Sequence, residues 1–333
     1  RESTKTLDAM AERVLIAGNI HQDGLRLFEQ REGLSVKITE AVDEATLAGL
    51  AHDVSAILVR SARISAAAID SAPHLKVVSR HGVGFNSVDV DALTARGIPL
   101  AIAVGGNAVS VAEHTFYLIL ALTKHGGDYD AAARHGDFSY RSRPLATEVS
   151  GKSLLVIGFG RIGTRVAARA LAFDMEVLVY DPYVDPKTIR AGGCTEVTDL
   201  HAVLPGVDIL TIHCPLNAET TGLVSARELE AMQPSAILIN TARGGVVDET
   251  ALYTALTQHT ITAAGIDVFV TEPTVQDDPL LTLDNVIVSP HCAGVTCESS
   301  SRTSRIAAQN VLSALDGSIE PEFVVNAEVL KHA

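Results

Sequence analysis

Residues 154–182 read LLVIGFGRIGTRVAARALAFDMEVLVYDP: an apolar run, a glycine-rich turn, a helical pattern and a second apolar run that ends on an acid. Gly158, Gly160 and Gly163 follow the first predicted strand with the spacing G-x-G-x-x-G. Such glycines permit a tight turn, backbone approach to a pyrophosphate, and close packing of the helix that we expect to begin near Arg161. The segment therefore predicts a βαβ unit whose helix N-terminus faces phosphate groups.

The acid at the end of the second run indicates which dinucleotide is bound. Asp181 lies 23 residues after Gly158 and closes the predicted strand at 177–180. A carboxylate there can bind both hydroxyls of an adenosine ribose and would repel a 2′-phosphate. Pro182 and Tyr183 add no neighbouring cation. We therefore predict NAD(H) as the cofactor in preference to NADP(H).

Composition favours two α/β domains. The chain has 333 residues, of which 47% are apolar and only 4% aromatic, with no Trp, so its core must consist mainly of Val, Ile, Leu and Ala. A net charge of −14 argues against a nucleic-acid partner, and an anionic ligand would need a local basic pocket. The apolar stretch at 111–122 contains Glu113 and His114 and is too short to span a bilayer, so we expect no membrane partner.

The cysteines indicate a reducing compartment. They show no C-x-x-C pairing and no metal-ligand spacing, so we predict no metal site, no structural disulfide and a cytoplasmic location. The four are Cys194, Cys214, Cys292 and Cys297. Residues 1–10 are polar, lack a hydrophobic signal core and do not begin with Met, and we assign them no function.

Apolar runs alternate with helical patterns, which predicts βαβ units and parallel sheets that bind ligands at the carboxyl ends of their strands. Strands are predicted at 14–17, 35–38, 56–59, 77–79, 154–157, 177–180, 209–213, 236–240, 263–267 and 286–289. A long helix should run from residue 107 to about 125, followed by an exposed crossover at 126–150. The tail should form a helix at 298–315, and 323–325 could form a last strand.

Three polar side chains follow predicted strands after the glycine motif. Arg243, flanked by small residues, suits a carboxylate or keto oxygen because its fork makes paired hydrogen bonds. Glu272 stands before a proline, and His291 follows another. A carboxylate bonded to one imidazole nitrogen fixes the tautomer and leaves the other nitrogen to exchange a proton. We therefore expect Glu272 and His291 to be neighbours.

Several spaced motifs match a known family. They are VRSA at 59–62, RHGVG at 80–84, GNAVSVAE at 106–113, GFGRIG at 158–163, HCPLNAET at 213–220, NTARGG at 240–245 and PHCAG at 290–294. From residue 60 to about 294 the chain resembles the D-isomer-specific 2-hydroxyacid dehydrogenases, in particular their phosphoglycerate-dehydrogenase-like branch. This implies an α/β fold of two doubly wound parallel-sheet domains, a Rossmann NAD-binding domain at 107–296 inserted into a flavodoxin-like substrate domain made of 10–106 and 297–333.

The resemblance also assigns residues to roles. Arg243, Glu272 and His291 would be the catalytic set that moves a proton while a hydride passes between NAD(H) and a small 2-oxo or 2-hydroxy acid. Cofactor contacts would come from Gly158, Gly160, Arg161, Ile162, Gly163, Asp181, His213, Cys214, Pro215, Thr220, Thr241, Ala242, Asp267 and Gly294. Substrate contacts would come from Arg60, Ser61, Arg80, Gly82, Val83, Gly84, Asn107, Arg243 and His291. A homodimer is implied, with 107–121 and 126–150 as its candidate interface.

The substrate remains open. His81 replaces a residue that is commonly small in the family, and Asn86-Ser87 replaces a frequent acidic-amide pair. Arg60, Arg63 and Arg80, with Arg141 or Arg143, could bind a distal phosphate, sulfonate or carboxylate, as in acids of the 3-phosphoglycerate, hydroxypyruvate/glyoxylate or sulfolactate type. One alternative is an NAD(H)-sensing corepressor of the C-terminal-binding-protein type on the same scaffold. Formate dehydrogenases share the fold, but their site combines Gln with His, and Glu272 argues against this class.

Overall fold

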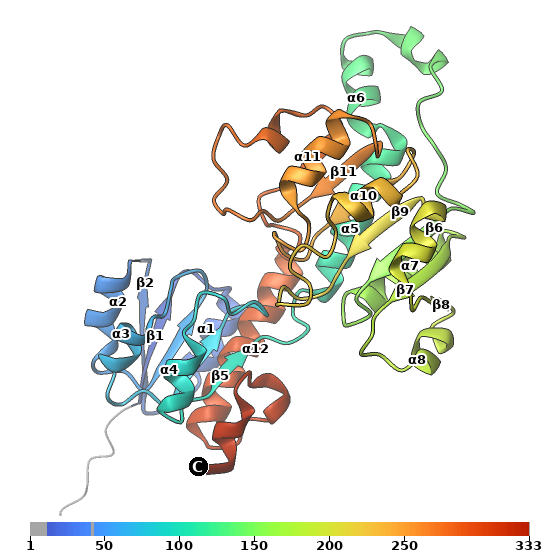
Figure 1. The fold of residues 1–333 in the computed structure, drawn as a ribbon. Coiled ribbons are helices and arrows are strands. Elements are labelled where there is room, and N and C mark those ends of the chain that lie inside the picture. The colour runs from blue at the N-terminus through green and yellow to red at the C-terminus, as the bar shows by residue number, and fades with distance from the viewer. Residues whose placement is uncertain (1–11, 41–42, 333) are drawn as a thin grey trace, which may run out of the picture. The chain divides into compact units, whose positions relative to one another are not determined.

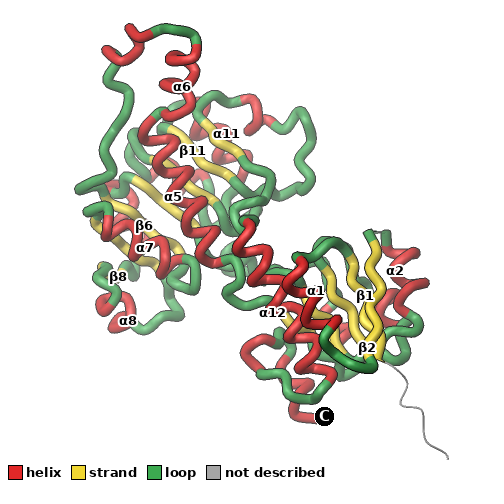
Figure 2. Tube along the Cα trace, turned by 180° about the vertical axis from the view of Figure 1, so that it is seen from behind, coloured by secondary structure: helices red, strands yellow, loops and turns green. Residues whose placement is uncertain are grey.

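The computed structural model describes residues 12–40 and 43–332, and it divides into two compact units (Figures 1 and 2). Unit 1 comprises the chain up to Asn107 together with the chain from Thr296 onward. Unit 2 is the intervening segment Ala108–Val295. Within the described ranges, no helix is both long enough and apolar enough to cross a membrane.

Unit 1 is built on a five-stranded parallel sheet with the order β2-β1-β3-β4-β5. Its strands are β1 (Glu12–Ala17), β2 (Leu34–Thr39), β3 (Ala56–Val59), β4 (Val77–Arg80) and β5 (Leu100–Ile102). Its helices are α1 (Gln22–Glu29), α2 (Glu44–Ala51), α3 (Ala66–Asp70), α4 (Val90–Ala95) and α12 (Cys297–Leu315), with 3₁₀ turns at Pro321–Phe323 and Ala327–His332. Alternate β1 residues serve the two faces, because Ile16 packs with α1 and α12 whereas Leu15 packs with α2, α3 and α4.

Unit 2 is built on a seven-stranded parallel sheet with the order β12-β11-β10-β9-β6-β7-β8. Its strands are β6 (Ser153–Ile157), β7 (Glu176–Tyr180), β8 (Thr195–Glu196), β9 (Ile209–Ile212), β10 (Ile237–Asn240), β11 (Ala263–Ile266) and β12 (Val286–Val288). Its helices are α5 (Ala108–Lys124), α6 (Gly126–Arg134), α7 (Gly163–Ala172), α8 (Pro186–Ala191), α9 (Leu200–Val203), α10 (Ala226–Ala231) and α11 (Glu249–Thr257), with 3₁₀ turns at Phe138–Ser142, Leu204–Gly206 and Pro279–Thr282.

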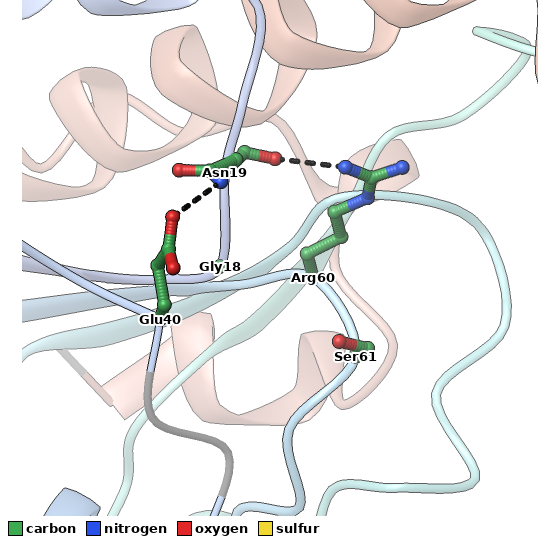
Figure 3. A pocket seen from close by; sticks show the side chains of 5 residues that line it. All are labelled: Gly18, Asn19, Glu40, Arg60 and Ser61. Carbon is green, nitrogen blue, oxygen red and sulfur yellow. Dashed lines mark hydrogen bonds between the residues drawn. The ribbon is translucent and has the colours of Figure 1, made fainter.

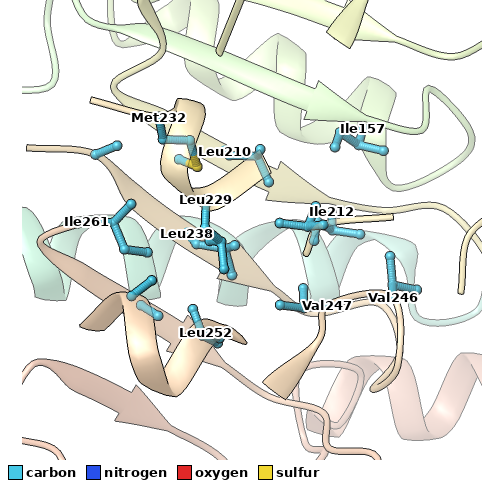
Figure 4. Packing of buried hydrophobic residues seen from close by; sticks show 14 of the residues in the cluster. Ile157, Leu210, Ile212, Leu229, Met232, Leu238, Val246, Val247, Leu252 and Ile261 are labelled. Carbon is cyan, nitrogen blue, oxygen red and sulfur yellow. The ribbon is translucent and has the colours of Figure 1, made fainter. Parts of the chain in front are cut away.

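The strands of unit 2 are buried on both faces, as expected for a doubly wound sheet. On one face Leu154 and Val156 pack against α5 and α7. On the other face Leu155 and Ile157 pack with Leu210 and the residues of α9, α10 and α11, the cluster drawn in Figure 4. The strand order reverses at β6 and β9, and such switch points place ligands at the carboxyl ends of the strands. The predicted class of two doubly wound parallel-sheet domains, one inserted into the other, is confirmed.

Several local features differ from the predictions. The crossover at 126–150 contains α6 and a 3₁₀ turn, and the strands β5 and β8 were not predicted. The proposed last strand at 323–325 is instead the end of a 3₁₀ turn that begins at Pro321, followed by a single antiparallel bridge from Val324 to Ala101. Helix α7 begins at Gly163, because Arg161 and Ile162 form a turn before it.

Candidate active site

The glycine turn joins β6 to α7 and leaves room for a ligand at one position. A Cβ on Gly163 would lie 1.9 Å from the carbonyl oxygen of Gly158, and a Cβ on Gly158 would lie 2.8 Å from the backbone nitrogen of Cys214. Both glycines are therefore needed for packing within the protein itself. A Cβ on Gly160 would meet no atom within 4 Å. Gly160 thus leaves open backbone at the place where a pyrophosphate would lie, so these residues fit a dinucleotide.

Asp181 links this turn to the end of β7. Its Oδ2 accepts a hydrogen bond of 2.7 Å from the backbone N–H of Phe159, and its Oδ1 accepts one of 3.0 Å from that of Tyr183. A carboxylate has about four acceptor sites, so capacity remains for ribose hydroxyls. The side chain therefore holds the glycine turn in place and also presents its charge beside it.

The loop after β9 contributes neutral groups. The Nε2 of His213 lies 2.9 Å from the Oγ1 of Thr211, and burial lowers the pKa of His213 to about 3. Its Nδ1 is buried and has no hydrogen-bond partner among the described residues. Burial, with the nearby Asp181, raises the pKa of the Cys214 thiol to about 11, which argues against a thiolate at neutral pH. The Oγ1 of Thr220 donates to the carbonyl of Pro215 at 2.6 Å, so it folds this loop back on itself.

The loop after β10 is shaped by Asn240, which the sequence analysis did not assign. Its Oδ1 accepts from the backbone N–H of Ala242 at 3.0 Å, and its Nδ2 donates to the carbonyl of Arg243 at 2.9 Å. The Nη1 of Arg243 donates to the carbonyl of Ala242 at 2.6 Å, and burial lowers the pKa of its guanidinium. A Cβ on Gly244 would lie 2.1 Å from the carbonyl of Phe269, so only glycine allows this loop to touch the loop that precedes Glu272.

Thr241, a predicted cofactor contact, is anchored to α5. Its Oγ1 lies 3.1 Å from the Oγ1 of Thr115, and the pair is buried. This contact fixes the strand end from which Ala242 and Arg243 follow.

The predicted pair of acid and imidazole is brought together. The Nδ1 of His291 lies 2.6 Å from the Oε2 of Glu272, and the Oε1 of Glu272 accepts from the backbone N–H of Phe269 at 3.0 Å. His291 has a φ of +51°, a left-handed conformation that side chains other than glycine adopt uncommonly and that clusters at functional sites. Its side chain is 47% exposed. With Nδ1 donating to the carboxylate, Nε2 is left to exchange a proton.

Asp267 organises the loop that carries His291. Its side chain is only 1% exposed, and Oδ1 accepts from the hydroxyl of Ser289 at 2.5 Å and from the N–H of Cys292 at 2.9 Å. Oδ2 accepts from the N–H of Ala293 at 2.9 Å. The N–H of His291 donates to the Asp267 carbonyl at 2.8 Å. One residue at the end of β11 therefore fixes the segment 289–293, which ends beside Gly294, another predicted cofactor contact.

Two of the predicted substrate residues, Arg60 and Ser61, line a pocket of about 300 Å³ in unit 1 (Figure 3). It lies at the carboxyl ends of β1, β2 and β3, and its other lining residues are Gly18, Asn19 and Glu40. The Nη1 of Arg60 donates to the carbonyl of Asn19 at 3.1 Å, and the Nδ2 of Asn19 donates to Glu40 at 3.0 Å. Asn19 and Glu40 were not predicted as site residues, and the carboxylate of Glu40 makes the pocket more mixed in charge than expected.

The other predicted substrate residues of unit 1 lie outside this pocket, and Arg243 and His291 belong to unit 2. Arg80 ends β4, and its Nη1 donates to the carbonyl of His81 at 3.0 Å rather than lining the pocket of Arg60. Gly82, with a φ of +145°, begins the turn that contains Val83 and Gly84. Asn107 stands directly before α5.

His81 is neutral at ordinary pH. Burial, together with the positive charges of Arg60 and Arg80, lowers its pKa to about 4. Its Nε2 lies 2.8 Å from the Oγ of Ser304 in α12. The residue that departs from the common family pattern therefore anchors the end of β4 and adds no charge.

The comparisons with known proteins agree with this geometry. A model of the NAD binding domain of the D-isomer specific 2-hydroxyacid dehydrogenases matches residues 116–293. The D-3-phosphoglycerate dehydrogenase of Archaeoglobus fulgidus is 36% identical over 306 residues, which cover 92% of this chain and 58% of that protein. The glyoxylate reductase of Thermofilum pendens is 36% identical over 329 residues, 96% of each chain.

A solved structure is also similar to this chain. The NADPH-dependent glyoxylate/hydroxypyruvate reductase of Sinorhizobium meliloti, in complex with NADP and malonate, has a TM-score of 0.81 and 30% identity, with 92% of this chain and 94% of that chain covered. The Rossmann unit with its glycine turn places the chain in the class of NAD-binding proteins. Within that class, the chain belongs to the D-isomer-specific 2-hydroxyacid dehydrogenase family. It spans less than two thirds of the length of several relatives named D-3-phosphoglycerate dehydrogenase.

Proposed function

We propose that the protein is an NAD-dependent oxidoreductase that transfers a hydride between NAD(H) and a small D-2-hydroxy or 2-oxo acid. The observation that carries this proposal is the 2.6 Å contact between Glu272 and His291, at the sheet edge that also holds the glycine turn. The relatives are named as dehydrogenases and reductases. These names give no support to the corepressor alternative.

The chain's own residues supply binding and proton transfer. A bound NAD(H) would supply or accept the hydride. In the direction of reduction, Nε2 of His291 gives a proton to the keto oxygen, and the neutral ring left behind stays oriented by Glu272 through Nδ1. Arg243 binds the substrate carboxylate and the keto oxygen, since a partly buried guanidinium makes strong paired hydrogen bonds. In oxidation His291 takes the hydroxyl proton instead.

For the cofactor, we propose that Gly158, Gly160, Arg161, Ile162 and Gly163 approach the pyrophosphate, and that Asp181 binds the adenosine ribose. Open backbone at Gly160 and the acceptor capacity of Asp181 support this assignment. Asp267 would contact the nicotinamide carboxamide.

The distal group of the substrate decides which acid is used. We propose that Arg60 and Ser61 take part in binding it, with Arg80, Gly82, Val83, Gly84 and Asn107 as further contacts. The guanidinium of Arg60 favours a distal anion or hydroxyl, as in acids of the 3-phosphoglycerate, hydroxypyruvate/glyoxylate or sulfolactate type. Glu40 in the same pocket favours groups that also donate a hydrogen bond.

We further propose a homodimer in the cytoplasm. In unit 2 the arm of α5, α6 and the following segment exposes Tyr117 (57%), Phe138 (71%) and Leu145 (39%), a set of large apolar side chains suited to an interface. All four cysteines lie in described residues and are free thiols, which fits a reducing compartment. Sedimentation as a monomer at micromolar concentration would contradict the dimer.

The test is a series of initial rates of NADH oxidation with 2-oxo acids that differ only in the distal group: methyl, hydroxyl, phosphate, sulfonate, carboxylate and polyol. We expect turnover with several of them and a preference for a polar or anionic distal group. If the protein binds NADH but shows negligible turnover across the whole series, the result would contradict the proposed enzymatic activity and favour an NAD(H) sensor.

A further inference from the structure

Behind Asp267 lies a chain of hydrogen-bonded side chains that the proposed mechanism does not use. It begins at His114, a polar residue in the apolar helix α5, whose side chain is 18% exposed. The Nε2 of His114 lies 2.9 Å from the Oγ of Ser289, and that Oγ lies 2.5 Å from the Oδ1 of Asp267. All three residues belong to unit 2. The chain thus links a helix on the face of the sheet to the carboxylate at its edge.

The directions of these hydrogen bonds follow from the chemistry of the groups. A carboxylate accepts only, so the single hydroxyl proton of Ser289 points to Asp267. The Ser289 oxygen must then accept from His114, which places the imidazole proton on Nε2. His114 is therefore a donor that polarises and orients the Ser289 hydroxyl.

This arrangement limits which acceptor positions of Asp267 are open. Its two oxygens already accept from Ser289 and from the N–H groups of Cys292 and Ala293. The capacity that remains has a fixed direction, because a buried carboxylate held by three donors cannot rotate without losing one of them. Loss of the Ser289 bond would free the carboxylate to turn within its loop.

We propose that His114 is a positioning residue which, through Ser289, aims the Asp267 carboxylate at the carboxamide end of the nicotinamide cofactor. The inference rests on the proposed function, since it takes Asp267 as the residue that contacts the nicotinamide. It predicts that His114 affects binding of the nicotinamide half of NADH and not of the adenosine half, which is bound at the glycine turn and Asp181.

A metal ion is the competing use of the same side chains. His114, Asp267 and Cys292 place one ligand atom each within 4.8 Å of one another, and nitrogen, oxygen and sulfur are donors that Zn²⁺ accepts. Two observations favour the hydrogen-bonded chain. The hydrogen bonds of 2.9 and 2.5 Å through Ser289 already occupy the His114 nitrogen and the Asp267 oxygen that a metal would need. Burial together with Asp267 also raises the pKa of the Cys292 thiol, which disfavours the thiolate that a metal needs.

The experiment compares the affinities of NADH and ADP-ribose, which lacks the nicotinamide, by calorimetry with the full chain. His114→Leu removes the donor, His114→Gln places an amide N–H near the former Nε2, and His135→Leu is a control that removes an exposed imidazole from the end of α6. We expect His114→Leu to bind NADH about tenfold more weakly, the effect of one lost hydrogen bond to a charged group, and to bind ADP-ribose within about twofold of the unaltered protein. His114→Gln should recover most of the NADH affinity, and His135→Leu should change neither ligand.

Three outcomes would overturn the inference. Equal weakening of NADH and ADP-ribose by His114→Leu would mean general damage to unit 2, and unchanged binding of both would mean that His114 does not act on Asp267. Zn²⁺ that competes with NADH in the unaltered protein and not in His114→Leu would assign these side chains to a metal. Failure of the unaltered protein to bind NADH would instead overturn the proposed function, which keeps the two failures apart.

Discussion

The carboxyl edges of the two sheets are built on different principles. At the edge of the seven-stranded sheet, polar side chains bind one another and nearby backbone N–H groups. Glu272 contacts His291 and accepts from the N–H of Phe269, and Asp267 accepts from one hydroxyl and two N–H groups. At the edge of the five-stranded sheet, Arg60 makes one 3.1 Å bond to a backbone carbonyl in an open pocket. The first edge holds reacting groups in fixed positions before any ligand arrives, whereas the second leaves charge for a ligand to complete.

The largest expected effect lies at the preorganised edge. His291→Ala should lower kcat for NADH-dependent reduction of a 2-oxo acid by about 10²–10⁴, because it removes the proton donor. Affinity for NADH, measured by fluorescence titration, should remain. His135→Ala, which removes an exposed imidazole from the end of α6 in the same unit, is the control. Loss of NADH binding in His291→Ala would show structural damage instead.

The cofactor side of the same edge should give the next largest effect. Asp181→Ala should raise the dissociation constant of NADH about 10–100-fold, because it removes hydrogen bonds from ribose hydroxyls to a charged acceptor. It also removes the tie to Phe159 that holds the glycine turn. Asp277→Ala, at an exposed acid of unit 2, should leave binding unchanged. Equal NADH affinity in both variants would show that Asp181 does not contact the cofactor.

A smaller effect is expected at the open edge of unit 1. Arg60→Gln should raise KM for a 2-oxo acid with a distal anion by about tenfold and leave kcat nearly unchanged, because ground-state binding is lost without any change in the reacting groups. Glyoxylate, which has no distal group, should be unaffected. Arg13→Gln, at the amino end of β1 with a side chain that is 56% exposed, offers a matched cation. If kcat fell with glyoxylate as well, the contrast between the two edges would be wrong.

The smallest effect concerns stability and pH. The pKa of His81 is about 4 in the folded protein, below the 6.5 of an exposed histidine, so the unfolded chain binds more protons between these values. The contribution of neutral His81 to the free energy of unfolding is complete above pH 6.5 and is lost as the pH falls toward 4. We expect the free energy of unfolding, measured by urea denaturation, to fall between pH 7 and pH 5 in both proteins. The fall should be about 1–2 kcal/mol smaller for His81→Gln than for the unaltered protein. Equal losses would contradict the buried, neutral state of His81.

Features that depend on local sequence were predictable. Gly158, Gly160, Gly163 and Asp181 lie in one βαβ unit whose period and spacing predict their positions. Glu272 and His291 were predicted as neighbours because each follows a parallel strand at the same edge, and the structure places them 2.6 Å apart. Their roles in catalysis stay predictions until the variants are measured.

Features that depend on contacts between distant residues were not predictable. His114 meets Ser289 across 175 positions, and Asn19 meets Glu40 because β1 and β2 are adjacent in the sheet. No local pattern reports such a meeting. Helix α6 was missed because it buries no residue and so has no apolar face, and β8 was missed because it has only two residues.

We propose that the edge containing His291 and Glu272 serves hydride transfer to the C2 of a 2-oxo acid. The most direct measurement uses NADH carrying deuterium at both C4 positions, hydroxypyruvate as the substrate, and NMR of the product. We expect D-glycerate with one deuterium on C2, formed by the unaltered protein and not by His291→Ala. Glycerate without deuterium at C2 would contradict hydride transfer at this edge. The same holds if the protein binds NADH but forms no product from hydroxypyruvate or from any other 2-oxo acid tested.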